Sequence, residues 1–269
     1  YSDKTFFFLT FGGANGLRMG TNGNGGSLTP DVSFNWFDYF LFHDDDKENI
    51  CNEGRIIMGE RFDQNLVYTF NHNLPNITSN RSMNVYYYAG STAPVNSELI
   101  LKVNNNTASS INFNAYTPNY DCFDGKAGSG SVNTTNPSAE LSFRYNRANA
   151  SSKAWLDYYE LHCSRKLTFS EGYMTFQNIQ SATATVAEYR LSNLPSSYQL
   201  FDVSDPLNVK IQDVFTDNGE FVFRGQPGGL IRRYVLNDGN TLSPVFEGTV
   251  ANQNLHNTGV IQFIIVSPP

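Results

Sequence analysis

Apolar and polar residues alternate with a period of two in residues 110–116 and again in residues 140–146. The apolar positions are Ile111, Phe113 and Ala115 in the first segment and Leu141, Phe143 and Tyr145 in the second. Successive side chains of a β-strand point to opposite faces of the sheet, so this pattern is typical of an antiparallel strand with one buried and one hydrated face. Both segments are therefore predicted strands.

Further strand-like runs recur along the chain at intervals of about 8–12 residues, as in a β-sandwich or barrel. They cover residues 66–70, 85–88, 99–103, 155–167, 173–179, 186–191, 209–215, 221–223 and 245–250, and the apolar runs at 5–11 and 34–42 are also of strand length. Turn dipeptides such as Asn218-Gly219 and Asp238-Gly239 separate several of them. No segment keeps a helical period over twelve residues. We therefore predict an all-β fold, an antiparallel β-sandwich that is jelly-roll-like.

Two stretches depart from this pattern. Residues 125–136 are rich in Gly, Ser and Asn and predict a mobile surface loop. Residues 260–266, with the sequence VIQFIIV, are almost wholly apolar, which is typical of a strand in a parallel sheet covered on both faces. We expect this last strand to be the first one of a following α/β domain. The predicted organisation is a β-hairpin region over 1–53, a β-sandwich over 54–250, and a linker with a truncated domain over 251–269.

The composition supports a globular β-protein. Hydrophobic residues make up 40% of the 269 residues, charged residues 16% and aromatic residues 14%, and aromatic side chains favour strands. The formal net charge is −7 without a local cluster of Lys or Arg, so we expect no nucleic-acid partner. No apolar run approaches the ~20 residues that a membrane-spanning helix needs, so no membrane span is expected.

The cysteines and histidines offer little catalytic chemistry. Three cysteines, Cys51, Cys122 and Cys163, leave open whether one disulfide or none forms. His162 and Cys163 are adjacent on a predicted strand and so point to opposite faces, which argues against a thiol dyad. No known nucleotide-binding or hydrolase motif is present. We therefore expect no catalytic residue and no cofactor-binding residue in this chain.

Metal chemistry is confined to one acidic run. Asp44, Asp46 and Glu48 supply hard oxygen ligands that suit Ca²⁺, although the spacing lacks the central glycine of an EF-hand. A solvated turn is the competing interpretation. His43, His72 and His256 have no second His or Cys at ligand spacing, so zinc is not expected. We interpret Glu60, which lies near Arg55 and Arg61, as a structural ion-pair partner.

Aromatic residues offer a possible glycan platform. Trp155 and Tyr87, with Trp36, are candidates for stacking on the apolar faces of sugars. In the run Tyr86-Tyr87-Tyr88 the outer two rings share one face of the strand and the middle ring takes the other, so at least one ring is expected in the core.

Five short segments occur in the order found in a known family. They are YSDKTFFFLT (1–10), GRIIMGERF (54–62), AWLDYYELHCSRKL (154–167), LFDVSDP (200–206) and VANQNLH (250–256). Together they resemble the region before the peptidase domain in gingipain-type cysteine peptidases, most of all the PorU-type sortases of the type IX secretion system of Bacteroidetes. Residues 56–58 depart from that family, which has an aromatic-containing stretch there.

The resemblance implies a parent cysteine endopeptidase or transpeptidase whose caspase-like catalytic domain follows residue 250. In that family the sortase removes the C-terminal sorting signals of exported cargo and attaches the cargo to the cell surface. The implied partners are the downstream peptidase domain, cargo proteins and other secretion components. The implied location is the periplasm or outer-membrane surface of a Gram-negative bacterium. We expect this chain to scaffold or position that domain without catalysis; the alternative is a carbohydrate-binding jelly-roll module of a surface protein.

Overall fold

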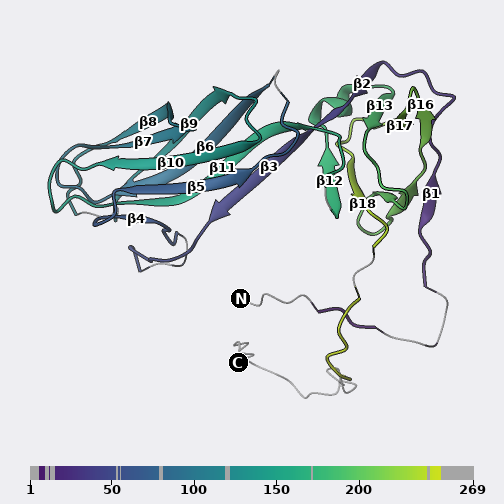
Figure 1. Cartoon of the computed structure of the whole chain (residues 1–269). Coiled ribbons are helices and arrows are strands. Elements are labelled where there is room, and N and C mark those ends of the chain that lie inside the picture. The colour runs from purple at the N-terminus through teal and green to yellow at the C-terminus, as the bar shows by residue number, and fades with distance from the viewer. Residues whose placement is uncertain are drawn as a thin grey trace. The chain divides into compact units, whose positions relative to one another are not determined.

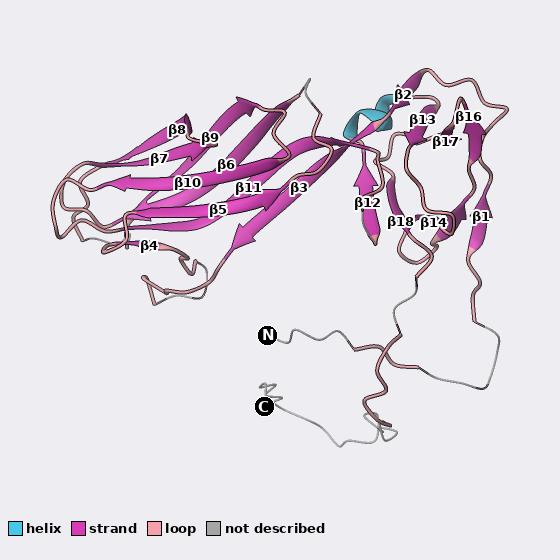
Figure 2. Cartoon of the chain, viewed as in Figure 1, coloured by secondary structure: helices cyan, strands magenta, loops and turns pink. Residues whose placement is uncertain are grey.

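The computed structural model describes residues 6–9, 12, 16–52, 54, 56–78, 81–118, 122–170, 172–240 and 243–249. The chain divides into a unit over Tyr1–Gly239 and a unit over Asn240–Pro269. All strands of the described residues lie in the first unit, together with one short 3₁₀ helix, η1 (Ile179–Thr183) (Figure 2). The second unit has no strand or helix among its described residues.

Eight long strands form the first sandwich (Figure 1). One sheet has the order β3 (Trp36–Asp44), β11 (Ala154–Lys166), β6 (Ser82–Ser91) and β9 (Asp124–Asn133), with β4 (Arg61–Phe62) also on β11. The other has the order β5 (Val67–Asn73), β10 (Ser138–Asn146), β7 (Ser97–Val103) and β8 (Asn106–Phe113). Counted in chain order without β4, the sheets read 1-8-3-6 and 2-7-4-5, and all their pairings are antiparallel. This is the strand order of a jelly roll, so the predicted fold class is confirmed.

The core of the jelly roll lies where the alternating pattern placed it. Leu141, Phe143 and Tyr145 of β10 are at most 1% exposed, and they pack with Tyr87 of β6 and Tyr159 of β11 in one hydrophobic cluster. Full burial of such side chains contributes roughly 1.5–3 kcal/mol each. The hydrophobic effect thus fixes which face of each strand is inside.

Nine shorter strands form a second sandwich with its own core. One sheet has the order β1 (Gly20–Asn22), β15 (Lys210–Gln212), β14 (Gln199–Asp202), β18 (Arg233–Asn237) and β12 (Tyr173–Gln177). The other has the order β16 (Phe215–Asp217), β17 (Glu220–Gly225), β13 (Ala187–Leu191) and β2 (Val32–Phe34). Its aromatic core includes Phe176, Tyr189, Phe223 and Tyr234.

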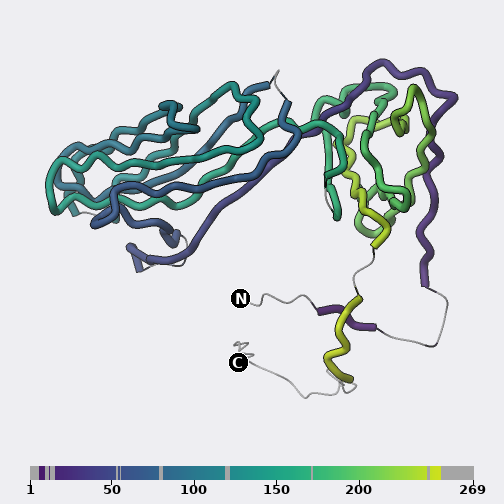
Figure 3. Tube along the Cα trace, viewed as in Figure 1, coloured from purple at the N-terminus to yellow at the C-terminus, as the bar shows by residue number. Residues whose placement is uncertain are grey.

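The N-terminal strands belong to both sandwiches. β2 pairs with β13 in parallel and β3 pairs with β11 antiparallel, so the predicted hairpin region 1–53 supplies strands to the sheets. In Figure 3 the purple to blue part of the tube runs along one sandwich and then into the other. A boundary at residue 53 therefore falls inside a sandwich, and the span 54–250 contains parts of two cores.

Three predicted segments come out differently. Residues 125–136, predicted to be a loop, are largely β9, because the glycines of this strand make room for rings from β6 and for β8. Residues 245–249 carry no strand, and neither do residues 6–9 of the predicted first strand. The apolar segment 260–266 and the motif at 250–256 lie outside the described residues.

Candidate functional site

The outer face of the sheet β3-β11-β6 carries a continuous surface of aromatic rings. We call it the aromatic face and define it by six residues: Phe40 and Phe42 on β3, Tyr158 and His162 on β11, and Tyr86 and Tyr88 on β6. The strand register brings them together, since His162 pairs with Phe40 and Tyr158 pairs with Tyr88.

The rings of the aromatic face contact one another in edge-to-face, tilted and stacked arrangements. His162 lies between Phe40 and Tyr86, with ring centroids 5.0 and 5.2 Å away. Tyr158 bridges Phe42 at 5.7 Å and Tyr88 at 6.4 Å. These separations lie in the favourable range for aromatic pairs. The surface is therefore an ordered platform.

The platform is exposed to solvent. Phe40 is 55% exposed, Phe42 49% and Tyr86 45%. At its centre, the imidazole Nε2 of His162 lies 2.9 Å from Oε2 of Glu160. Contiguous exposed apolar surface of this kind marks interaction sites more often than chance, and a central polar pair would orient a bound partner. Chemically, the face is suited to binding a flat apolar surface.

The alternation of side chains along the strands predicted part of the aromatic face. Tyr86 and Tyr88 were predicted to share a face of their strand, and they do. Phe40 and Phe42 also stand two residues apart, and this spacing could have indicated exposed neighbours on β3. Their contact with β11 depends on a register that the sequence does not show.

Of the three glycan candidates named from the sequence, Tyr87 and Trp155 are buried, and the half-buried ring of Trp36 is covered by the guanidinium of Arg81, 3.5 Å from its centroid. Tyr87 is 1% exposed, and its hydroxyl forms a 2.8 Å hydrogen bond with that of Ser109. Trp155 is 3% exposed, and its indole N–H donates to Glu48 at 2.8 Å. Neither ring offers a face to a sugar, so a role in stacking is wrong for both; they pack in the interior because their polar atoms find partners there.

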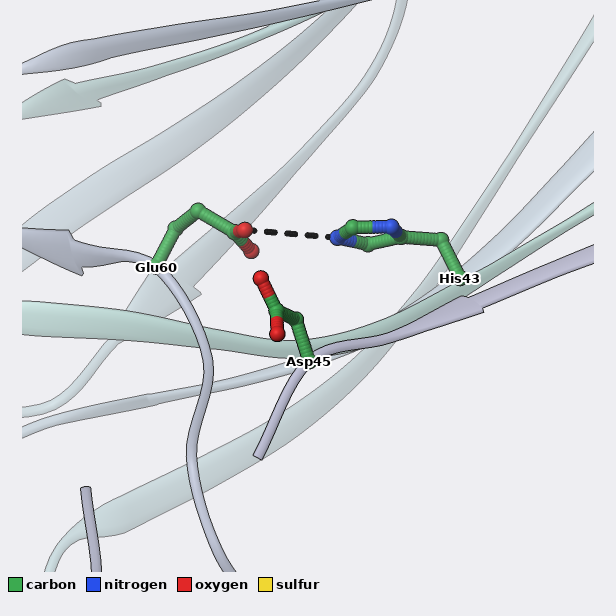
Figure 4. Close-up of side chains that lie close together, drawn as sticks. All are labelled: His43, Asp45 and Glu60. Atoms are coloured by element: carbon green, nitrogen blue, oxygen red, sulfur yellow. Dashed lines mark hydrogen bonds and ion pairs between the residues drawn. The ribbon is translucent and has the colours of Figure 1, made fainter. Parts of the chain in front are cut away.

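A polar cluster lies at the end of β3, beside β4 (Figure 4). The imidazole of His43, the carboxylate of Asp45 and the carboxylate of Glu60 place their ligand atoms within 4.8 Å of one another. Nε2 of His43 is 3.3 Å from Oε1 of Glu60. Nζ of Lys47 lies 3.0 Å from the same Oε1 and 2.6 Å from Oδ2 of Asp45.

The electrostatics of this cluster follow from those contacts. The hydrogen bond from Lys47 lowers the pKa of Asp45, and Asp45 in turn raises the pKa of Lys47. Glu60 is 4% exposed and its second oxygen, Oε2, has no hydrogen-bond partner. Glu60 is an ion-pair partner as predicted, but its partner is Lys47. Of the two arginines named from the sequence, Arg61 pairs with Asp63 and Glu48, and Arg55 lies outside the described residues.

The predicted calcium ligands Asp44, Asp46 and Glu48 are arranged differently from an ion-binding set. Glu48 already accepts hydrogen bonds from Arg61 and Trp155. Asp44 and Asp46 lie near Asp157, whose pKa is raised to about 6 by burial and then by these two charges. Among the described residues, the set within ligand distance is His43, Asp45 and Glu60. Calcium binding stays a prediction.

The cysteines divide into one disulfide and one buried thiol. Cys51 and Cys122 are bonded, with Cα atoms 5.4 Å apart. Cys163 is 6% exposed, and burial raises the pKa of its thiol to about 11, against a smaller opposing effect of Arg165. His162 lies on the outer face of the same strand, so the two side chains point apart as predicted. A thiol in this state is not a nucleophile.

The second sandwich carries a polar pocket of about 420 Å³. The segment 200–206 contributes Asp202, Ser204 and Asp205 to its wall, and Arg224 and Arg232 stand among the other lining residues. Its charges are of both signs, and Asp202 already accepts a hydrogen bond from Ser204.

Comparison with known proteins identifies the fold. No protein-family model matches the chain, and no curated protein matches it at the sequence level. The crystal structure of dimeric latent PorU from Porphyromonas gingivalis matches with a TM-score of 0.77 and 19% identity over 91% of this chain. This chain spans only 24% of that PorU chain.

Two carbohydrate-binding modules show much weaker likeness. A CBM36 module in complex with calcium and xylotriose has a TM-score of 0.27, with 14% identity over 35% of this chain and 71% of its own. The CBM36-1 domain of a xylanase from the hindgut metagenome of Trinervitermes trinervoides has a TM-score of 0.32, with 10% identity over 46% of this chain and 95% of its own. In the described residues no helix is long and apolar enough to cross a membrane. The chain thus has a PorU-like, all-β fold.

Proposed function

We propose that this chain is a non-catalytic β-module of a larger exported protein related to the PorU sortases. The main support for this proposal is the structural match to PorU. It includes 91% of this chain at a TM-score of 0.77 but only 24% of the PorU chain. In this proposal the parent is a gingipain-type cysteine endopeptidase or transpeptidase with its catalytic domain after residue 250. The parent removes sorting signals from cargo and attaches the cargo to the cell surface.

The state of the cysteines supports a non-catalytic role in an exported protein. Cys163 is buried with a raised pKa, and the Cys51–Cys122 disulfide is of the kind that persists in oxidising compartments. The proposed location is the periplasm or outer-membrane surface of a Gram-negative bacterium.

The aromatic face supports a positioning role. Its exposed rings would lose unfavourable contact with water if another folded domain covered them, at about 25 cal/mol for each Å² of apolar area. We propose that the occupant is the downstream domain of the same polypeptide, with cargo and secretion components as further partners. The matched region is 24% of the PorU chain, which is why we choose a neighbouring domain of the same polypeptide as the occupant.

The experiment combines this 269-residue chain with the separately expressed polypeptide that follows residue 269 in its gene. We expect thiol-dependent peptidase activity only in the downstream polypeptide, and no change with Cys163→Ala in this chain. We expect binding in trans that weakens at least tenfold in a Phe40→Ala/Phe42→Ala variant. Val67→Ala is the matched control, because Val67 is an exposed apolar residue on β5 of the opposite sheet. Peptidase activity of this chain itself, or a downstream sequence without a peptidase domain, would overturn the proposal.

A carbohydrate-binding module is the second candidate, and the exposed rings of Phe40, Phe42 and Tyr86 favour it. Titration with surface polysaccharides distinguishes the two. Saturable glycan binding that is lost in the Phe40→Ala/Phe42→Ala variant, without binding to the downstream polypeptide, would support this alternative.

A further inference from the structure

We propose that His43, Asp45 and Glu60 form a zinc-binding site at the end of β3. One imidazole and two carboxylates are a ligand set that Zn²⁺ accepts, whereas Ca²⁺ and Mg²⁺ prefer oxygen ligands alone. The three ligand atoms lie within 4.8 Å of one another and come from the end of β3, the loop that follows it and the residue before β4.

Part of the geometry already fits. Bonds of about 2.1 Å in a tetrahedral site place neighbouring ligand atoms about 3.4 Å apart. Nε2 of His43 and Oε1 of Glu60 are 3.3 Å apart. Only Asp45 has to move closer, and its side chain is half exposed on the loop after β3.

Glu60 supplies an independent indication that the cluster binds a cation. Its carboxylate is 4% exposed, yet Oε2 has no hydrogen-bond partner. Leaving a buried charged oxygen unpaired is costly, so such an atom is expected to have a partner. Figure 4 shows the Glu60 carboxylate directed toward His43 and Asp45.

Lys47 shows that a cation is favoured at this position. Its ammonium bridges Asp45 and Glu60, and its side chain is half exposed, so it can leave toward solvent. A zinc ion would take its place between the two carboxylates. The ammonium is therefore a competitor of the metal.

The ring of His43 is held in position for coordination. It stacks on Tyr159 with centroids 4.8 Å apart and contacts Phe70 at 4.7 Å. A preorganised ligand loses less conformational freedom on binding. The fourth position is left for water or for a group of a partner.

The test is zinc titration of the tag-free chain at pH 7.5 with a chromophoric competitor. We expect one equivalent of Zn²⁺ to bind, at least a hundredfold more tightly than Ca²⁺. Binding should weaken at least tenfold in His43→Ala, Asp45→Asn and Glu60→Gln. It should strengthen at least fivefold in Lys47→Met, because the competing ammonium is gone.

His162→Ala is the matched control, because His162 also pairs with a glutamate but lies on the aromatic face, outside the cluster. Asp45→Asn keeps the test valid if Glu60→Gln does not fold, since Asp45 is half exposed. The proposal is overturned if the wild type and Lys47→Met bind no stoichiometric Zn²⁺. It is also overturned if His162→Ala weakens binding as much as His43→Ala, or if Lys47→Met leaves the affinity unchanged. None of these results bears on the peptidase proposal.

Discussion

Cys163 illustrates how burial alone removes the chemistry of a residue. Its thiol lies in the core of the jelly roll with a pKa raised to about 11, so at pH 8 only about one molecule in a thousand carries the thiolate. We expect alkylation by iodoacetamide at pH 8 to be at least a hundredfold slower in the folded protein than in 8 M urea. Mass spectrometry of quenched samples measures both rates. Comparable rates would mean that the thiol is accessible, against this structure.

Asp157 is the opposite case, a charge held where the fold disfavours it. Its pKa rises from 3.8 to about 6, first by burial and then by Asp44 and Asp46. A folded-state pKa above the unfolded value means that ionisation costs stability, and the penalty grows from about pH 4 and is complete above pH 6. Asp157→Asn should therefore stabilise the protein at pH 7.5, by about 1–2 kcal/mol after allowance for solvent screening.

Thermal unfolding of wild type and Asp157→Asn at pH 7.5 and pH 3.5 measures this effect. The gain in melting temperature should be clear at pH 7.5 and largely absent at pH 3.5, where the carboxyl is protonated in the folded state and mostly protonated in the unfolded state. An equal gain in melting temperature at both pH values would show that the charge of Asp157 is not the cause of the stabilisation.

At the scale of elements, what could be predicted depended on which residues fill the interior. β10 was predicted because its own apolar side chains alternate, and they occupy the core. β9 was not predicted as a strand, because its inward positions include Gly128 and Gly130, which have no apolar side chain to produce an alternating pattern. A Cβ at Gly130 would lie 2.9 Å from that of Ala108 on β8, and one at Gly128 would overlap the ring of Tyr87. Neighbouring strands fill the space beside β9, so its sequence carries no apolar period.

Gly128→Ala tests this account of β9. The added methyl group would meet the hydroxyl oxygen of Tyr87 at 2.5 Å, in a core where that ring is 1% exposed. We expect a loss of about 1–3 kcal/mol in urea unfolding. Ser129→Ala, on the exposed face of the same strand, should change stability by less than about 0.5 kcal/mol.

A double variant separates the clash from a backbone effect. In a Tyr87→Leu background, Gly128→Ala should cost clearly less than it does alone, because the overlapping atoms are gone. An unchanged cost would assign the loss to the backbone conformation of β9 and contradict the packing explanation.

The candidate sites show the same limit. Nothing in the sequence around Asp45 or Glu60 indicates a metal site. His43 likewise has no second His or Cys nearby that would indicate a ligand set. Glu60 reaches His43 because β4 and β3 both pair with β11, a long-range arrangement that periodicity does not encode. The aromatic face likewise needs three strands in one register.

For the whole molecule, the main covalent constraint is the Cys51–Cys122 disulfide, which closes a loop of 71 residues within the jelly roll. Closing a loop of that length restricts the unfolded chain and stabilises the fold by about 4 kcal/mol in the chain-entropy model. We expect a reducing agent to lower the free energy of unfolding by about this amount, measured by urea titration with and without reductant.

Variants at each cysteine assign the effect to this bond. A Cys51→Ser/Cys122→Ser variant should match the reduced wild type and should not respond to reductant. Cys163→Ala should respond as the wild type does, because Cys163 is a free thiol buried in the core and takes no part in the disulfide. Equal stability of wild type with and without reductant, together with three titratable thiols in unreduced unfolded protein, would contradict the disulfide. Such a result would also remove the argument for an oxidising compartment, because this bond is the structural feature that favours export.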